Sequence, residues 1–157
     1  MVESLVVLAE HALSSADAQR IVALHDPDRP SVRVLVPAGG RRNVLVDVLD
    51  HLSLLQLREA LGAVQGHVER TPAQAEAAVR GSVAELRRLG CEASGEAVTG
   101  DPMAALDAEV QAGAEEVVIV TAPHAVEDTL HRDWASVARE RLGVPVLHVY
   151  ADSSWVG

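Results

Sequence analysis

Two histidines and an aspartate have the spacing of metal ligands over about two turns of helix. They are His124, Asp128 and His131. At about 100° per residue, this spacing places all three within about 60° of arc on one helix face. Imidazole and carboxylate groups so placed can bind zinc or another divalent metal if a neighbouring loop adds a fourth ligand. The alternative, which we favour, is an acidic first turn at a helix N-terminus with histidines on its solvated face and no metal.

A second group of functional side chains lies in a glycine-containing turn. Residues 39–43 read Gly-Gly-Arg-Arg-Asn. Two glycines, two guanidinium groups and a helix start suit a small anion or a phosphorylated ligand. The same residues also fit an ordinary loop whose arginines are solvated. Arg41 and Arg42 are therefore candidate ligands of a small anion.

The side chains that could act as nucleophiles do not lie beside a base. Cys91 begins an apolar stretch directly after a helix-ending glycine, which predicts a packed thiol. No serine lies in a nucleophile-elbow pattern, and Ser14 is best explained as a helix cap. His148 alternates with apolar residues, which predicts a structural or interface role. The sequence therefore gives more support to a non-enzymatic protein than to an enzyme.

The elements that must position these residues alternate between apolar strands and amphipathic helices. Short apolar runs predict buried strands at 5–9, 32–36 (ending at Pro37), 91–98, 117–120 and 144–150. Helices are predicted after the N-caps Ser14, Thr71 and Asp101, and over about 125–142. Strands joined by short helical crossovers lie parallel to one another. The sequence therefore predicts an α/β fold, a five-stranded parallel sheet with helices on both faces.

One stretch does not fit this alternation. Residues 38–70 are less regular, and 44–61 are too apolar for a solvated helix. We expect an irregular or helical insertion that packs against the sheet or a second subunit. The remainder holds no repeat and no second domain, so 1–157 are predicted to form a single domain with 151–157 as a tail.

In parallel sheets of this kind, ligands bind past the carboxyl ends of the strands, where the strand order reverses. The loops after the first, second and fourth predicted strands are therefore where we expect a site. Together they supply the candidate pocket residues Glu10, His11, Arg41, Arg42, Thr121 and His124.

Three stretches in the C-terminal part of the chain are distinctive. They read GCEASGEAVTGDPMAAL at 90–106, AGAEEVVIV at 112–120 and GVPVLHV at 143–149. The first resembles the third strand and the start of the following helix in the universal stress protein family. The second resembles the entry into the family's fourth strand, and the third resembles its last strand. The N-terminal half agrees with the family only in the order of its elements. The resemblance implies the strand order 3-2-1-4-5 and, often, a dimer formed through the fifth strand.

The resemblance also implies where a nucleotide would bind. Family members that bind ATP carry a loop of the form G-x2-G-x9-G-S/T after the fourth strand, because glycines let backbone N–H groups approach phosphates. The corresponding stretch here, 121–136, contains no glycine, and Thr121 and His124 fall near the first two glycine positions. Pro123 removes a donor, and Glu127 and Asp128 add negative charge. We therefore expect a polyphosphate to be repelled and no cofactor to be bound.

The end of the first strand gives a weaker correspondence. ATP-binding members usually place an aspartate there, which contacts the nucleoside. Glu10 is the nearest match, and His11 follows it where the family has glycine.

Composition limits the classes of partner. Among 157 residues, 13 are Lys or Arg and 23 are Asp or Glu, which gives a net charge of −10. Nucleic acids and anionic membranes both require a basic surface, so neither is expected as a partner. A single cysteine favours the reducing cytoplasm, and no apolar run approaches the length of a membrane-spanning helix.

The predicted fifth strand, 144–150, is apolar and lies at an edge in the order 3-2-1-4-5. An exposed apolar edge invites pairing unless it is shielded. Antiparallel pairing with the same strand of a second subunit closes it through a two-fold contact. We therefore expect a homodimer through 144–150.

These observations favour a universal stress protein-like, stress-associated dimer that is non-enzymatic, does not bind ATP strongly, and acts through a partner or a small ligand. The alternative is a nucleotide-binding member with an altered loop, in which Glu10, Thr121 and the pair Arg41–Arg42 replace the missing glycines. A phosphate- or metal-dependent enzyme on the same scaffold has the least support, because no nucleophile–base pair is visible in the sequence.

Overall fold

The computed structural model describes residues 2–38, 71–121 and 129–152, with the backbone alone at 129–134 and 136. Its centre is one five-stranded sheet, and every pair of neighbouring strands is parallel. The strands are β1 (Ser4–Ala9), β2 (Ser31–Ala38), β3 (Ala93–Thr99), β4 (Glu116–Thr121) and β5 (Val146–Tyr150). Their order, β3-β2-β1-β4-β5, confirms the predicted fold class and topology.

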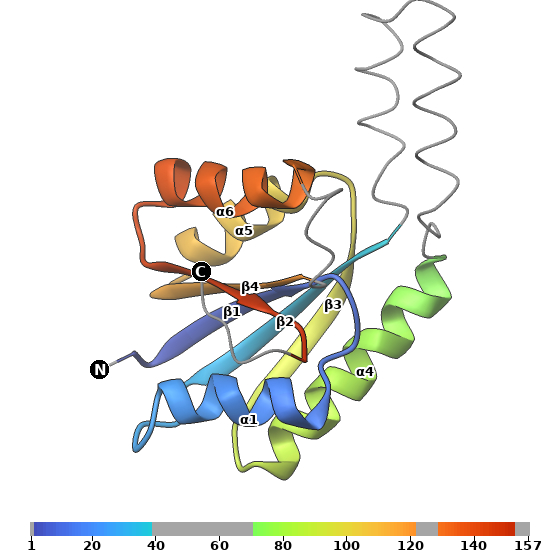
Figure 1. Cartoon of the computed structure of the whole chain (residues 1–157), viewed down its shortest axis with the longest axis vertical. Helices are drawn as coiled ribbons and strands as arrows, with labels where there is room; N and C mark the ends of the chain where they lie inside the picture. The colour runs from blue at the N-terminus through green and yellow to red at the C-terminus, as the bar shows by residue number, and fades with distance from the viewer. Residues whose placement is uncertain (1, 39–70, 122–128, 153–157) are drawn as a thin grey trace, which may run out of the picture.

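The helices form one layer on each face of the sheet (Figure 1). Helices α1 (Ser15–Leu24) and α4 (Pro72–Arg88) cover one face, and α5 (Pro102–Gln111) and α6 (Thr129–Leu142) cover the other. Two separate apolar clusters fill the spaces between the sheet and these layers. The central strand β1 serves both: Leu5 and Val7 belong to the α1/α4 side, whereas Val6 and Leu8 belong to the α5/α6 side. Continuous apolar runs are therefore required here, because both faces of the strand are buried.

The helix starts follow the capping chemistry that the sequence predicts. Ser14 caps α1 in a reciprocal box with Asp17, and Thr71 caps α4 in the same way with Gln74. The side chain of Asp101 caps α5 by accepting from the backbone N–H of Met103. Each cap satisfies backbone donors that the first helical turn cannot bond internally.

Some boundaries differ from the predictions. Strand β2 continues through Pro37 to Ala38, whereas the sequence predicts that it ends at the proline. The last residue of β2 that pairs with β1 is Leu35, opposite Leu8. Pro37 lies beyond this pair, so its missing N–H costs no hydrogen bond to β1. Pairing with β3 continues to Ala38↔Thr99 on the other side. The predicted insertion at 38–70 lies, after Ala38, outside the described residues, as does the tail beyond Asp152.

Candidate functional site

The carboxyl edge of the sheet brings two of the predicted site residues together. Glu10 follows β1 and its backbone N–H donates to the carbonyl of Val120, one residue before Thr121. Glu10 is partly exposed and His11 is exposed, whereas Thr121 is 1% exposed. The other three predicted pocket residues, Arg41, Arg42 and His124, lie outside the described residues.

The hydroxyl of Thr121 is used inside the protein. Its Oγ1 lies 2.8 Å from Nε2 of His148, and His148 is 5% exposed. The two residues lie on neighbouring strands, where the register pairs Thr121 with Tyr150. The rings of His148 and Tyr150 are in contact, with centroids 4.5 Å apart. A hydroxyl bonded to a buried imidazole satisfies both polar groups, so this pair stabilises the end of β4 rather than presenting Thr121 to solvent.

The sequence predicts a structural or interface role for His148 but not its partner. The missed signal is a polar side chain at an alternating position of an otherwise apolar strand. Such a residue needs a hydrogen-bond partner on the same face of the sheet, and a neighbouring strand must supply it.

A buried carboxylate occupies the start of α1, beside the end of β1. Asp17 is 2% exposed, and its Oδ2 accepts from the backbone N–H of Ser14 at 3.4 Å. Its Oδ1 accepts from the backbone N–H of Asp152 at 2.9 Å and lies 3.7 Å from Nη2 of Arg20. In return, Ser14 Oγ accepts from the N–H of Asp17 at 3.1 Å. A carboxylate of the protein itself therefore lies in the first turn of the helix, where negative charge is favourable.

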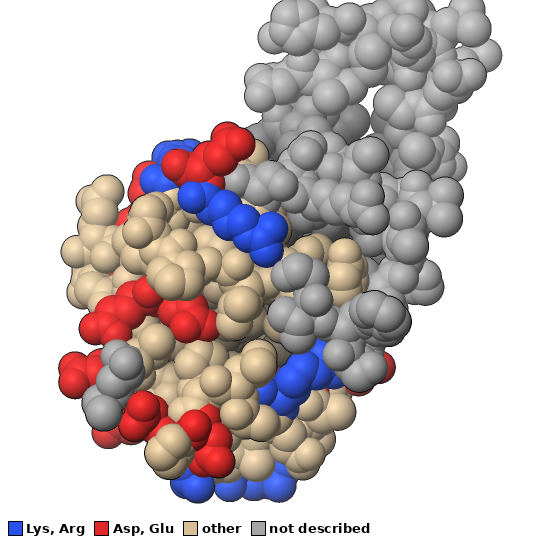
Figure 2. Space-filling view, turned by 60° about the vertical axis from the view of Figure 1, so that its left-hand side comes forward, with Lys and Arg blue, Asp and Glu red and all other residues tan. Residues whose placement is uncertain are grey.

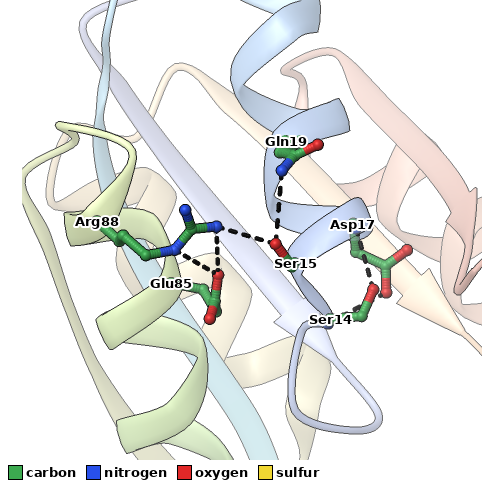
Figure 3. Close-up of polar contacts among 6 residues, drawn as sticks. All are labelled: Ser14, Ser15, Asp17, Gln19, Glu85 and Arg88. Carbon is green, nitrogen blue, oxygen red and sulfur yellow. Dashed lines mark hydrogen bonds and ion pairs between the residues drawn. The ribbon is translucent and has the colours of Figure 1, made fainter.

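The guanidinium group of Arg88, near the start of α1, forms hydrogen bonds with residues of the protein (Figure 3). Arg88, the last residue of α4, donates from Nη2 to Ser15 Oγ at 2.9 Å. The same guanidinium bonds Glu85 through Nε at 3.1 Å and Nη2 at 2.9 Å. Figure 3 shows Ser15 bonded to both Arg88 and Gln19, and the Ser14–Asp17 cap at the same end of α1. The positive charge of Arg88 is thus balanced by Glu85.

The structure offers no support for metal binding in the part of the chain it describes. Among those residues, no group of three His, Cys, Asp or Glu side chains is placed to hold a metal ion. Of the predicted metal-ligand set, His124 and Asp128 lie outside the described residues, and only the backbone of His131 is described.

The single cysteine is packed, as the sequence predicts. Cys91 is 5% exposed and belongs to the apolar cluster under α4. Burial raises the pKa of its thiol above the ordinary value, and the positive charge of Arg29 opposes this in part. A thiol in such surroundings carries little thiolate at neutral pH and is a poor nucleophile.

The surface charge is distributed in small groups. Figure 2 shows acidic and basic side chains in several small groups on one face, some of them adjacent to one another, with uncharged surface over much of the rest. This face therefore lacks the continuous basic area that nucleic acids require, as far as its described residues extend. None of the described helices has the length and apolar character needed to cross a bilayer.

Comparison with known proteins gives a structural likeness without a sequence match. No family model matches the sequence, and no curated protein matches it. The fold of the hypothetical protein MJ0577 is similar, with a TM-score of 0.60 and 13% identity over 98% of this chain and 100% of that one.

Two universal stress proteins are similar in the same way. The protein from Archaeoglobus fulgidus has a TM-score of 0.51 and 16% identity over 97% of this chain and 96% of its own. A universal stress protein in complex with cAMP has a TM-score of 0.54 and 12% identity over 96% of this chain and 98% of its own. Together with the strand order β3-β2-β1-β4-β5, these likenesses show that the chain has a universal stress protein-like fold.

Proposed function

We propose that this chain is a non-enzymatic, stress-associated protein of the universal stress type that does not bind ATP strongly. It acts as a homodimer in the cytoplasm, through a protein partner or a small ligand at the carboxyl edge of the sheet. The observation that carries the proposal is the buried carboxylate of Asp17 at the start of α1, 2.9 Å from the backbone N–H of Asp152.

The argument from Asp17 is electrostatic. A polyphosphate at this edge needs backbone donors and positive charge. Ser14 and Asp17 already satisfy donors at the start of α1, and Asp101 satisfies one at the start of α5. A phosphate beside α1 would also face the negative charge of Asp17 at close range, which costs binding free energy.

The sequence after β4 gives independent support. It contains no glycine from 121 to 136, so residues with side chains take the sequence positions at which ATP-binding members of the family have glycine. The side chain of Thr121 is poorly placed to contact a phosphate, because the residue is 1% exposed and its hydroxyl is bonded to His148.

The homodimer is supported by the position of β5. This strand pairs with β4 on one side and lies at the end of the sheet order. Its residues are largely apolar, and an apolar edge strand is stabilised by pairing with another strand. A two-fold contact through β5 also closes the assembly at two subunits.

The second candidate function is nucleotide binding, favoured by the cAMP complex of a structurally similar universal stress protein. In that case Glu10 and the pair Arg41–Arg42 would contact the nucleotide in place of the glycine loop.

Isothermal titration calorimetry with ATP, AMP and cAMP distinguishes the two functions. We expect dissociation constants weaker than about 1 mM for all three nucleotides. A value of about 10 µM or tighter for any of them would overturn the proposal in favour of the second function. The variant Arg41→Ala/Arg42→Ala is the control, since it weakens such binding only if the nucleotide lies at this edge.

A further inference from the structure

The hydrogen bonds between β4 and β5 show which backbone carbonyl groups of β5 point away from the sheet. The N–H of Val117 donates to the carbonyl of Pro145, and the N–H of Ala151 donates to the carbonyl of Thr121. Positions 145 and 151 therefore face β4. Because successive residues of a strand turn their N–H and C=O groups to opposite sides, the carbonyls of Val146 and Tyr150 face away from the sheet.

Arginine side chains reach both of these outward carbonyls. Arg139 donates from Nε to the carbonyl of Val146 at 3.3 Å, and Arg20 donates from Nη1 to the carbonyl of Tyr150 at 3.1 Å. Arg139 lies on α6 and Arg20 on α1, which are on opposite faces of the sheet (Figure 1). The two ends of the β5 edge are thus covered from the two helical layers. Asp17, 3.7 Å from Arg20, holds that arginine in place.

An arginine also bonds an outward-facing carbonyl at the other edge of the sheet, on β3. The N–H of Val32 donates to the carbonyl of Glu92, so position 93 of β3 faces outward. Its carbonyl accepts from Nε of Arg87 at 3.0 Å. Both edge strands therefore have an outward-facing carbonyl that accepts a hydrogen bond from an arginine. This recurrence argues against the contacts at β5 being incidental.

These contacts compete with strand pairing. In an antiparallel pair, each outward-facing residue that takes part gives its N–H and its C=O to the partner strand. An antiparallel register in which Val146 or Tyr150 pairs with the second strand therefore uses a carbonyl that already accepts a hydrogen bond from Arg139 or Arg20. The partner backbone would lie about 4.8 Å from β5, on the side from which Arg139 and Arg20 donate to these carbonyls.

We propose that Arg20 and Arg139 set the strength of homodimerisation by holding the β5 carbonyls that a second copy of this chain needs for antiparallel pairing. The proposal rests on the dimer through β5 in the proposed function. It adds the residues that oppose this dimer: pairing in a register that uses Val146 or Tyr150 requires the arginine on that carbonyl to move aside.

Sedimentation equilibrium of three full-length proteins tests this proposal. They are the wild type, Arg20→Met/Arg139→Met, and the control Arg88→Met/Arg141→Met. Methionine keeps much of the side-chain length and removes the donors. The control loses the same charge, but Arg88 and Arg141 bond Glu85 and Asp107 and make no described contact with β5. The single variant Arg139→Met keeps Arg20 on α1 and serves if the double variant folds poorly.

We expect the dimer dissociation constant of Arg20→Met/Arg139→Met to fall about tenfold or more, and that of Arg139→Met to fall by a smaller factor. The control should stay within about twofold of the wild type. Hydrogen exchange over 144–150 should slow as the double variant dimerises. A wild-type dimer whose constant is unchanged in the double variant overturns this inference and leaves the proposed dimer standing. A monomeric wild type with a dimeric double variant supports the inference and overturns the proposed wild-type dimer. Three monomeric proteins, or an equal gain in the control, overturn the inference.

Discussion

Thr121 and His148 form a buried hydrogen bond, 2.8 Å from Oγ1 to Nε2, that joins the carboxyl end of β4 to the edge strand β5. The bond assigns the hydroxyl of Thr121 to the interior of the protein. It also ties the edge strand to a more central strand at the position where a ligand of this fold class would approach.

Replacing Thr121 with valine should destabilise the protein. The shape of the side chain is kept, but His148 loses its partner inside a buried environment, which costs about 1–3 kcal/mol of unfolding free energy. Urea denaturation measures this loss. Thr121→Ser keeps the hydroxyl and should lie closer to the wild type, and a valine variant as stable as the wild type would contradict the structural role of the bond.

Two adjacent serines at the start of α1 should behave differently. Ser14→Ala removes the cap that accepts from Asp17 N–H and should cost about 1 kcal/mol. Ser15→Ala removes an exposed hydroxyl that accepts from Arg88, and should change stability by less than about 0.5 kcal/mol. Thermal and urea unfolding of both variants give the comparison. Equal losses would show that Ser14 is not the dominant cap.

Asp17→Asn should lower stability by more than Ser14→Ala. The carboxylate accepts from two backbone N–H groups and lies near Arg20, so its loss affects both the helix start and the turn at Asp152. Its favourable interaction with the helix dipole is lost as well. Faster hydrogen exchange at the Asp152 amide is the specific readout. An unchanged exchange rate there would contradict the proposed anchoring of the C-terminal turn.

The same substitution should have opposite effects at two glycines. A Cβ on Gly95 would lie 2.5 Å from the carbonyl oxygen of Val34 and 2.8 Å from Cγ1 of Val79. Gly95→Ala must therefore push α4 away from β3, and we expect a loss of about 1–3 kcal/mol. Gly81 lies inside α4, and its nearest neighbour to an added Cβ is Ala12 Cβ at 4.0 Å. Gly81→Ala should raise the free energy of unfolding by about 0.5–1 kcal/mol. Urea denaturation of both variants measures these changes. A more stable Gly95→Ala or a less stable Gly81→Ala would contradict the packing described.

The thiol of Cys91 should react slowly in the native protein. Burial raises its pKa, so less thiolate is present at a given pH than for a free thiol. The folded state also favours the protonated thiol, and this contribution to stability is present below the ordinary value of 9.0 and is lost as the pH rises above it. Reaction with a disulfide reagent should be slow until urea unfolds the chain. A fast reaction without denaturant would show that the thiol is accessible.

The local features of this fold were accessible from the sequence because they depend on neighbouring residues. Ser14 with Asp17 and Thr71 with Gln74 are three residues apart, so capping chemistry identifies them directly. The buried strands follow from continuous apolar runs, and the strand order follows from the family resemblance.

The contacts that define the site depend on tertiary register instead. Thr121 and His148 are 27 positions apart, and Asp17 and Asp152 are 135 apart. No periodicity connects such pairs, because their approach is fixed by which strands lie side by side and by their alignment. The arginines on the β5 edge are of the same kind, since Arg20 and Tyr150 are separated by 130 positions. The predictions for Arg41, Arg42 and His124 remain predictions.

The most direct test of the account is an NMR titration of isotope-labelled protein with ATP, followed at the backbone amides of Glu10, His11 and Thr121. If the carboxyl edge is closed to polyphosphates as Asp17 and the glycine-free segment indicate, these amides should show no saturable shift up to about 1 mM nucleotide. Saturable shifts at micromolar ATP, centred on these amides, would contradict it.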